Sequence, residues 1–145
     1  MTRRMSRPVI LIAASLAGLV FHWQGGMEGE AADMARHKTV SPAEAARLME
    51  GNGGNPEFVV LDVRTPEEYR DGHLEGAVMI DFRSNGFREK VETLDRGKTY
   101  LVYCRTGNRS GSAISMMEEM GFRRIYHLVD GIKGWREKGF PTTTR

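Results

Sequence analysis

Short apolar runs alternate with amphipathic segments from residue 37 to residue 138, and Gly-, Pro- or Asn-containing turns separate them. The apolar runs have strand length, and the run at 58–62 is as continuous as a strand covered on both faces. These runs predict five strands, at residues 38–40, 58–62, 76–80, 99–103 and 125–129. Because helix-like segments lie between them, we expect one α/β domain with a central, mainly parallel five-stranded sheet flanked by helices on both faces.

Two of the predicted helices carry explicit start signals. Ser41 and Thr65 are each followed by Pro and, at the third position after them, by Glu. This is the capping-box pattern with Pro at the first helical position. It predicts one helix to about Glu50 and a short one that ends before Gly72. Apolar residues on one face predict three further helices, at residues 87–94, 110–120 and 132–138.

Cys104 is the only cysteine, and it lies where a predicted strand passes through a Gly-containing loop into a predicted helix. Loop amides and the positive end of a helix stabilise a thiolate or a bound anion. Arg105 and Arg109 add positive charge beside it, so the pattern predicts a nucleophilic sulfur. The alternative, a small buried hydrophobe, is the usual role of a lone cysteine, but the position of Cys104 disfavours it.

The composition limits the other possibilities. A chain of 145 residues that is 40% apolar buries one good core. Its net charge of +2 gives no basic stripe for nucleic acid, so no nucleic-acid partner is expected. A single cysteine excludes an intramolecular disulfide, and no Cys/His cluster in the sequence indicates a zinc site. We therefore expect neither a metal nor a cofactor.

The first 32 residues have the three parts of a secretory signal. Arg3, Arg4 and Arg7 precede an apolar stretch at residues 9–21, and small residues follow at 29–32. We expect residues 1–32 to form a signal peptide and residues 33–145 the mature domain, exported to the periplasm. The alternative is an uncleaved membrane anchor, the only case in which the protein would contact a membrane. The apolar stretch is short for a span, which needs roughly 20 residues.

Four motifs in order give the chain a family resemblance. They are Asp62-Val-Arg64 with Glu68-Tyr69, Gly72-His73 with Gly76-Ala77, Tyr103 to Ser110, and Asp130-Gly131 with Trp135. Over residues 37 to 143 the sequence resembles a single-domain rhodanese, a family of sulfurtransferases that form a persulfide. It departs from the family at Asp130, where a glycine is usual, and this leaves the local backbone shape open.

The resemblance implies a thiosulfate sulfurtransferase of rhodanese fold. Cys104 would take the outer sulfur of a small anionic donor such as thiosulfate and pass it to cyanide or a thiol. The donor or acceptor could also be a protein. The persulfide would be held by the loop Arg105, Thr106, Gly107, Asn108, Arg109 and Ser110. We expect Arg105 at the mouth of the pocket and Ser110 as the helix N-cap, whereas Arg109 either contacts substrate or braces the loop.

Loop length separates sulfur chemistry from phosphate chemistry. Arg109 follows Cys104 after four intervening residues. The corresponding loop of cysteine phosphatases, which share this scaffold, has five. The smaller ring of amides suits one extra sulfur better than a tetrahedral phosphate, so phosphatase activity is disfavoured. A persulfide carrier and a non-catalytic partner-binding module remain as alternatives, and the intact Cys104 disfavours the second.

The remaining motif residues have structural interpretations. We expect Asp62, Arg64 and Glu68 to form an ion-pair network that braces the sheet end. His73 is expected to make hydrogen bonds in a turn, and Trp135 to pack against the sheet near Gly131.

Overall fold

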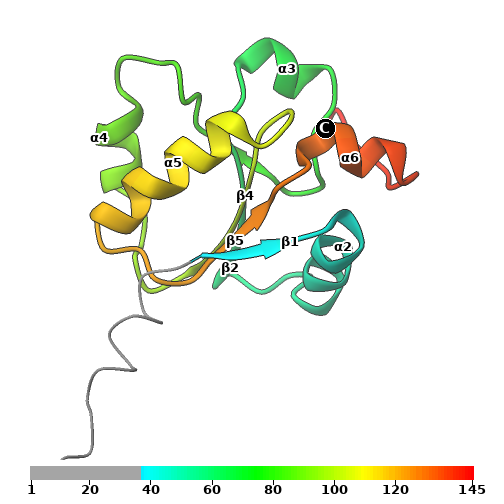
Figure 1. The fold of residues 1–145 in the computed structure, drawn as a ribbon, viewed down its shortest axis with the longest axis horizontal. Helices are drawn as coiled ribbons and strands as arrows, with labels where there is room; N and C mark the ends of the chain where they lie inside the picture. The colour runs from blue at the N-terminus through cyan, green and yellow to red at the C-terminus, as the bar shows by residue number, and fades with distance from the viewer. Residues whose placement is uncertain (1–36) are drawn as a thin grey trace, which may run out of the picture.

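The computed structural model describes residues 37–145, and it contains a five-stranded sheet with the strand order β1-β5-β4-β2-β3 (Figure 1). Every strand pair in this sheet is parallel. The strands are β1 (Lys38–Val40), β2 (Phe58–Asp62), β3 (Val78–Met79), β4 (Thr99–Tyr103) and β5 (Ile125–Leu128). The predicted α/β fold with a parallel five-stranded sheet is confirmed. The predicted signal at residues 1–32 lies outside the described residues.

Helices cover both faces of the sheet. Helices α4 (Phe87–Glu92) and α5 (Asn108–Glu119) pack on one face, and α2 (Pro42–Gly51) and α6 (Gly131–Glu137) pack on the other (Figure 1). The short helix α3 (Pro66–Arg70) follows β2 and lies near the start of α5. Within residues 37–145, none of the helices combines the length and hydrophobicity that a membrane crossing requires.

The side chains of β4 alternate between the two faces of the sheet and so contribute to two separate core clusters. Tyr100, Val102 and Cys104 face α4 and α5, whereas Leu101 and Tyr103 face α2 and α6. Successive side chains of a strand point to opposite faces, and both faces of the central strand β4 are buried because helices cover each side of the sheet. The side chain that follows β4 is therefore placed at the centre of the carboxyl edge of the sheet, where parallel α/β sheets bind their ligands.

The capping boxes are formed as predicted. The Ser41 and Thr65 hydroxyls accept from the backbone N–H of Glu44 and Glu68, and these two Glu side chains accept from the N–H of the capping residues. The edge strand β3 is shorter than the predicted residues 76–80. Its registered pairs with β2 are Val78 and Met79, and the strand starts late because Gly76 still belongs to the preceding turn with φ +70°.

Candidate active site

Cys104 lies directly after the carboxyl end of β4, and its residue surface is 1% exposed. The chain then turns through a short loop into α5. The backbone N–H of Gly107 donates to Cys104 Sγ at 3.1 Å, and the Ser110 hydroxyl points at the same sulfur at 3.4 Å. Strand, loop and helix thus aim several donors at one sulfur atom, as the sequence pattern predicts.

These donors control the ionisation of the thiol. Burial raises the pKa of Cys104. Hydrogen bonds from the Ser110 hydroxyl and from the backbone N–H groups of Ser110, Thr106 and Gly107 act against burial and leave that pKa below its ordinary value. Hydrogen bonds to the charged form favour it, and the start of a helix adds positive potential. The site therefore makes the Cys104 thiol easier to ionise than an ordinary cysteine.

Gly107 gives the loop its shape. It is the N-cap residue of α5 with φ +100°, and a Cβ there would collide with the carbonyl oxygen of Val129. The prediction that Ser110 is the N-cap is wrong. The helix begins at Asn108, so Ser110 lies inside its first turn. There the Ser110 hydroxyl oxygen is 3.0 Å from the Gly107 carbonyl oxygen, within hydrogen-bond distance. The glycine allows the helix to start early and to bring Ser110 over the sulfur.

The start of α6 supports the loop from the other side. The N–H of Ile132 donates to the Cys104 carbonyl at 2.9 Å. Gly131 has φ +60°, and a Cβ there would collide with the backbone of Arg105. Asp130 has φ −81° and ψ −4°, the ordinary right-handed region. The unusual Asp130 is accommodated because the left-handed conformation falls on Gly131 alone.

Arg109 forms a two-point ion pair with Glu68 of α3. Its Nη1 and Nη2 atoms lie 2.7 Å and 2.8 Å from the two carboxylate oxygens. Hydrogen bonding to Arg109 is the largest cause that lowers the pKa of Glu68 to about 2. Of the two roles open for Arg109, the geometry matches the brace. The predicted network of Glu68 with Asp62 and Arg64 is wrong, because Glu68 pairs with Arg109 instead.

Asp62 and Arg64 do form a buried pair. Asp62 is fully buried, and Arg64 Nε and Nη2 lie 2.9 Å and 2.6 Å from its two oxygens. Arg64 also donates to the Gly72 carbonyl at 2.8 Å. The Tyr103 hydroxyl donates to Asp62 at 2.6 Å and accepts from the N–H of Leu74. Burial, followed by the charge of Asp62, raises the pKa of Tyr103, which keeps that hydroxyl a donor.

His73 and Trp135 have the structural positions that the sequence predicts. His73 Nδ1 lies 2.8 Å from the Tyr69 carbonyl, and its ring stacks on Tyr69 with centroids 3.6 Å apart. Its backbone pairs in both directions with Thr143 near the C-terminus. Trp135 donates to the Pro141 carbonyl at 2.8 Å within the core cluster beside α2. Both residues attach the C-terminal segment to the domain.

Arg105 is exposed beside the loop and borders a cavity of about 220 Å³. The other lining residues are Arg64, Glu68, Asp71, Ile132 and Arg136. Since Arg64 and Glu68 are already paired, Arg105 and Arg136 are the basic side chains here that are exposed to solvent. Thr106 and Asn108 are also exposed. Within residues 37–145, no group of three His, Cys, Asp or Glu side chains is placed to hold a metal ion.

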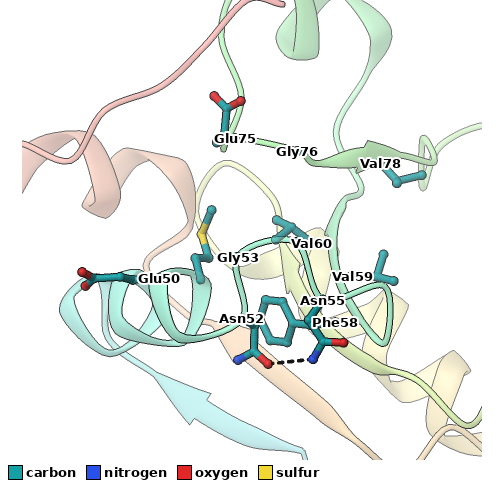
Figure 2. A pocket seen from close by; sticks show the side chains of 12 residues that line it. Glu50, Asn52, Gly53, Asn55, Phe58, Val59, Val60, Glu75, Gly76 and Val78 are labelled. Carbon is teal, nitrogen blue, oxygen red and sulfur yellow. Dashed lines mark hydrogen bonds between the residues drawn. The ribbon is translucent and has the colours of Figure 1, made fainter.

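A second pocket, of about 500 Å³, lies away from this site (Figure 2). It is bordered by the end of α2, by Phe58, Val59 and Val60 of β2, and by Val78 of β3. Among its lining residues, the Asn55 side chain donates to Asn52 at 3.1 Å. None of the loop residues 104–110 lines it, whereas Arg105 of that loop borders the smaller cavity.

The sequence reasoning missed His127. This residue lies in β5 on the side of α5, is 7% exposed, and places Nε2 2.8 Å from Ser110 Oγ. Burial, followed by the charge of His37, lowers the pKa of His127. A histidine in the middle of an otherwise apolar strand was the available signal. The partner of His127 depends on the strand order, which the sequence pattern leaves open.

The comparison with known proteins agrees with this architecture. The model of the rhodanese-like domain family matches residues 41–138, so this chain belongs to the rhodanese-like domain family. Several of its relatives are named as sulfurtransferases. The chain is 32% identical to the thiosulfate sulfurtransferase GlpE of Ectopseudomonas mendocina over 111 residues, which cover 77% of this chain and 94% of the relative.

Two further similarities concern a longer relative and a protein of known structure. The chain is 30% identical to the probable adenylyltransferase/sulfurtransferase MoeZ of Mycobacterium tuberculosis over 81% of its own length, but spans only 29% of that relative. A crystal structure of a rhodanese-related protein from Thermoplasma volcanium superposes with a TM-score of 0.64 at 28% identity. That match covers 75% of this chain and 100% of the other.

Proposed function

We propose that this protein is a thiosulfate sulfurtransferase that carries sulfur as a persulfide on Cys104. The observation that carries the proposal is the set of donors around Sγ, namely the Gly107 N–H at 3.1 Å and the Ser110 hydroxyl at 3.4 Å. They stabilise negative charge on Sγ, and in a persulfide the negative charge lies on the outer sulfur, which is bonded to Sγ.

The proposed reaction has two displacements. In the first, the Cys104 thiolate attacks the outer sulfur of thiosulfate, the S–S bond of the donor breaks, and sulfite leaves with the bonding electron pair. In the second, cyanide or a thiolate attacks the outer sulfur of the persulfide, and the Cys104 thiolate leaves. No proton must be abstracted in either step when the acceptor is anionic, so the site needs no general base.

Arg105 is proposed to attract the anionic donor. It is exposed beside the loop and lines the cavity with Arg136, whereas Arg109 is occupied by Glu68. Loop amides and exposed cations suit a small dianion such as thiosulfate, which binds and is then released as sulfite. A protein sulfur donor or acceptor would approach the same cavity.

We also propose that the domain acts outside the cytoplasm, in the periplasm. The basic, apolar and small-residue regions of residues 1–32 support export. Cell fractionation of the full chain with N-terminal sequencing tests it. A mature N-terminus near residue 32 in the periplasmic fraction is expected, whereas an intact N-terminus in the membrane fraction supports the anchor instead.

Mass spectrometry of the intact protein before and after thiosulfate tests the activity. Wild type is expected to gain one sulfur and to lose it on addition of cyanide, and Cys104→Ser to gain none. Ser115→Ala is the matched control, because Ser115 lies on the same helix and its exposed hydroxyl donates to the Gly111 carbonyl. A wild-type protein that gains no sulfur but hydrolyses an aryl phosphate would contradict the proposal. Sulfur gained only from a protein persulfide would favour the carrier role.

A further inference from the structure

Three residues from different parts of the chain form a row that begins at the candidate nucleophile. Cys104 follows β4, Ser110 lies in the first turn of α5, and His127 lies in β5. Ser110 Oγ is 3.4 Å from Cys104 Sγ and 2.8 Å from His127 Nε2. Ser110 is fully buried and His127 nearly so, so water does not compete for these contacts.

The hydrogens available to this row decide how it is connected. A third neighbour, the Gly107 carbonyl, lies 3.0 Å from Ser110 Oγ. A thiolate and a carbonyl only accept hydrogen bonds, and a serine hydroxyl has one hydrogen. If His127 Nε2 also accepted, three acceptors would compete for that hydrogen. If Nε2 carries a hydrogen, it donates to Oγ and leaves the hydroxyl hydrogen for the sulfur or the carbonyl.

We propose that His127 is a positioning residue for sulfur transfer at Cys104, donating from Nε2 to Ser110 Oγ so that the Ser110 hydroxyl points its hydrogen toward Sγ. This inference rests on the proposed function for its biological meaning. His127 touches neither sulfur nor substrate and acts through Ser110. It adds to the site a contribution from β5, the strand beside β4.

The surroundings of His127 support a neutral ring. The His37 ring contacts it edge-on, with centroids 5.6 Å apart, and His37 Nδ1 lies 3.0 Å from Glu118 of α5. These contacts link His127 to the titratable groups His37 and Glu118 on one side and, through Ser110, to Cys104 on the other. Burial and the charge of His37 both lower the pKa of His127. A neutral ring with hydrogen on Nε2 holds the serine without adding charge.

The test uses side chains that differ in where they place a donor. His127→Gln extends an amide N–H to about the position of Nε2, His127→Asn is too short to do so, and His127→Leu has no donor. The full-length protein carrying each change is alkylated with iodoacetamide across pH, which titrates the Cys104 thiol without any sulfur donor. Persulfide formation with thiosulfate is then followed over the same pH range, and circular dichroism reports folding.

We expect His127→Leu and His127→Asn to shift both pH profiles upward and to lower the alkylation rate at neutral pH roughly threefold to tenfold. His127→Gln is expected to stay close to wild type. In a Ser110→Ala background, the same changes at His127 are expected to have no further effect on the thiol. If the His127→Leu variant does not fold, the comparison of His127→Gln with His127→Asn still tests whether a donor at the position of Nε2 is needed.

Folded Leu and Asn variants whose thiol titrates like wild type would overturn the inference, even when wild type forms a persulfide. A purely structural role for His127 would change the melting temperature without moving the pH profile. If wild type forms no persulfide with thiosulfate while the thiol titration still shifts in the variants, the proposed function fails and the positioning role stands.

Discussion

The Arg109 guanidinium and the Glu68 carboxylate form a two-point ion pair, with N–O distances of 2.7 Å and 2.8 Å, that joins the first turn of α5 to α3. Glu68 also accepts from the N–H of Thr65, the cap of its own helix. Arg109, at the end of the loop that follows Cys104, is thus occupied by a structural contact. The role proposed for Arg105 and the loop amides, to attract an incoming anion, is therefore not shared by Arg109.

This pair makes stability depend on pH. The pKa of Glu68 falls from an ordinary 4.5 to about 2, so its contribution is present above pH 4.5 and is lost as the pH falls through 4.5 toward 2. At neutral pH we expect Glu68→Gln to lower the free energy of unfolding by about 1–3 kcal/mol. The difference from wild type should shrink in urea titrations carried out toward pH 3.

Glu67→Gln is the control for that series, because Glu67 is exposed and pairs with Arg70 on the surface. It should change stability by less than about 1 kcal/mol. A constant deficit of Glu68→Gln across the whole pH range would show that the pair does not titrate as described.

The buried pair below the loop is expected to be more sensitive. Arg64→Met leaves the fully buried Asp62 carboxylate without its cation and should cost about 3–5 kcal/mol. Tyr103→Phe removes one hydrogen bond to the same carboxylate and should cost about 1–3 kcal/mol. Denaturant unfolding measures both. A larger loss for Tyr103→Phe than for Arg64→Met would contradict this order.

Gly107→Ala is expected to abolish persulfide formation. The alanine would have to adopt φ +100°, and its Cβ would collide with the Val129 carbonyl. Gly54→Ala is the matched control, because Gly54 has φ +75° but open space around its Cα. It shares the backbone strain of about 1–2 kcal/mol and should retain sulfur transfer. Equal activity of the two variants would show that the close approach of the loop to β5 is not required.

Arg105→Ala is expected to raise the KM for thiosulfate roughly threefold to tenfold with a smaller change in kcat, because an exposed cation attracts the dianion during encounter. The effect should decrease in high salt. Arg88→Ala removes an exposed arginine of α4 that pairs with Glu92, and it should leave both constants unchanged. A fall in kcat alone for Arg105→Ala would place that residue at the reacting sulfur instead.

Much of what local interactions decide in this protein is predicted by the sequence alone. The capping boxes at Ser41 and Thr65 join residues three positions apart, and they form as predicted. The apolar runs predict the strands because a strand buried on both faces tolerates few polar side chains. The strand–loop–helix junction at Cys104 likewise follows from adjacent residues.

The tertiary structure decided which distant polar groups meet. Glu68 lies four positions from Arg64 in sequence, but it pairs with Arg109, 41 positions away, because α3 and the start of α5 meet at the same edge of the sheet. His127 reaches Ser110 because β5 lies beside β4 in the strand order. Buried polar groups must find partners, and the packing of elements far apart in sequence determines which partners are within reach.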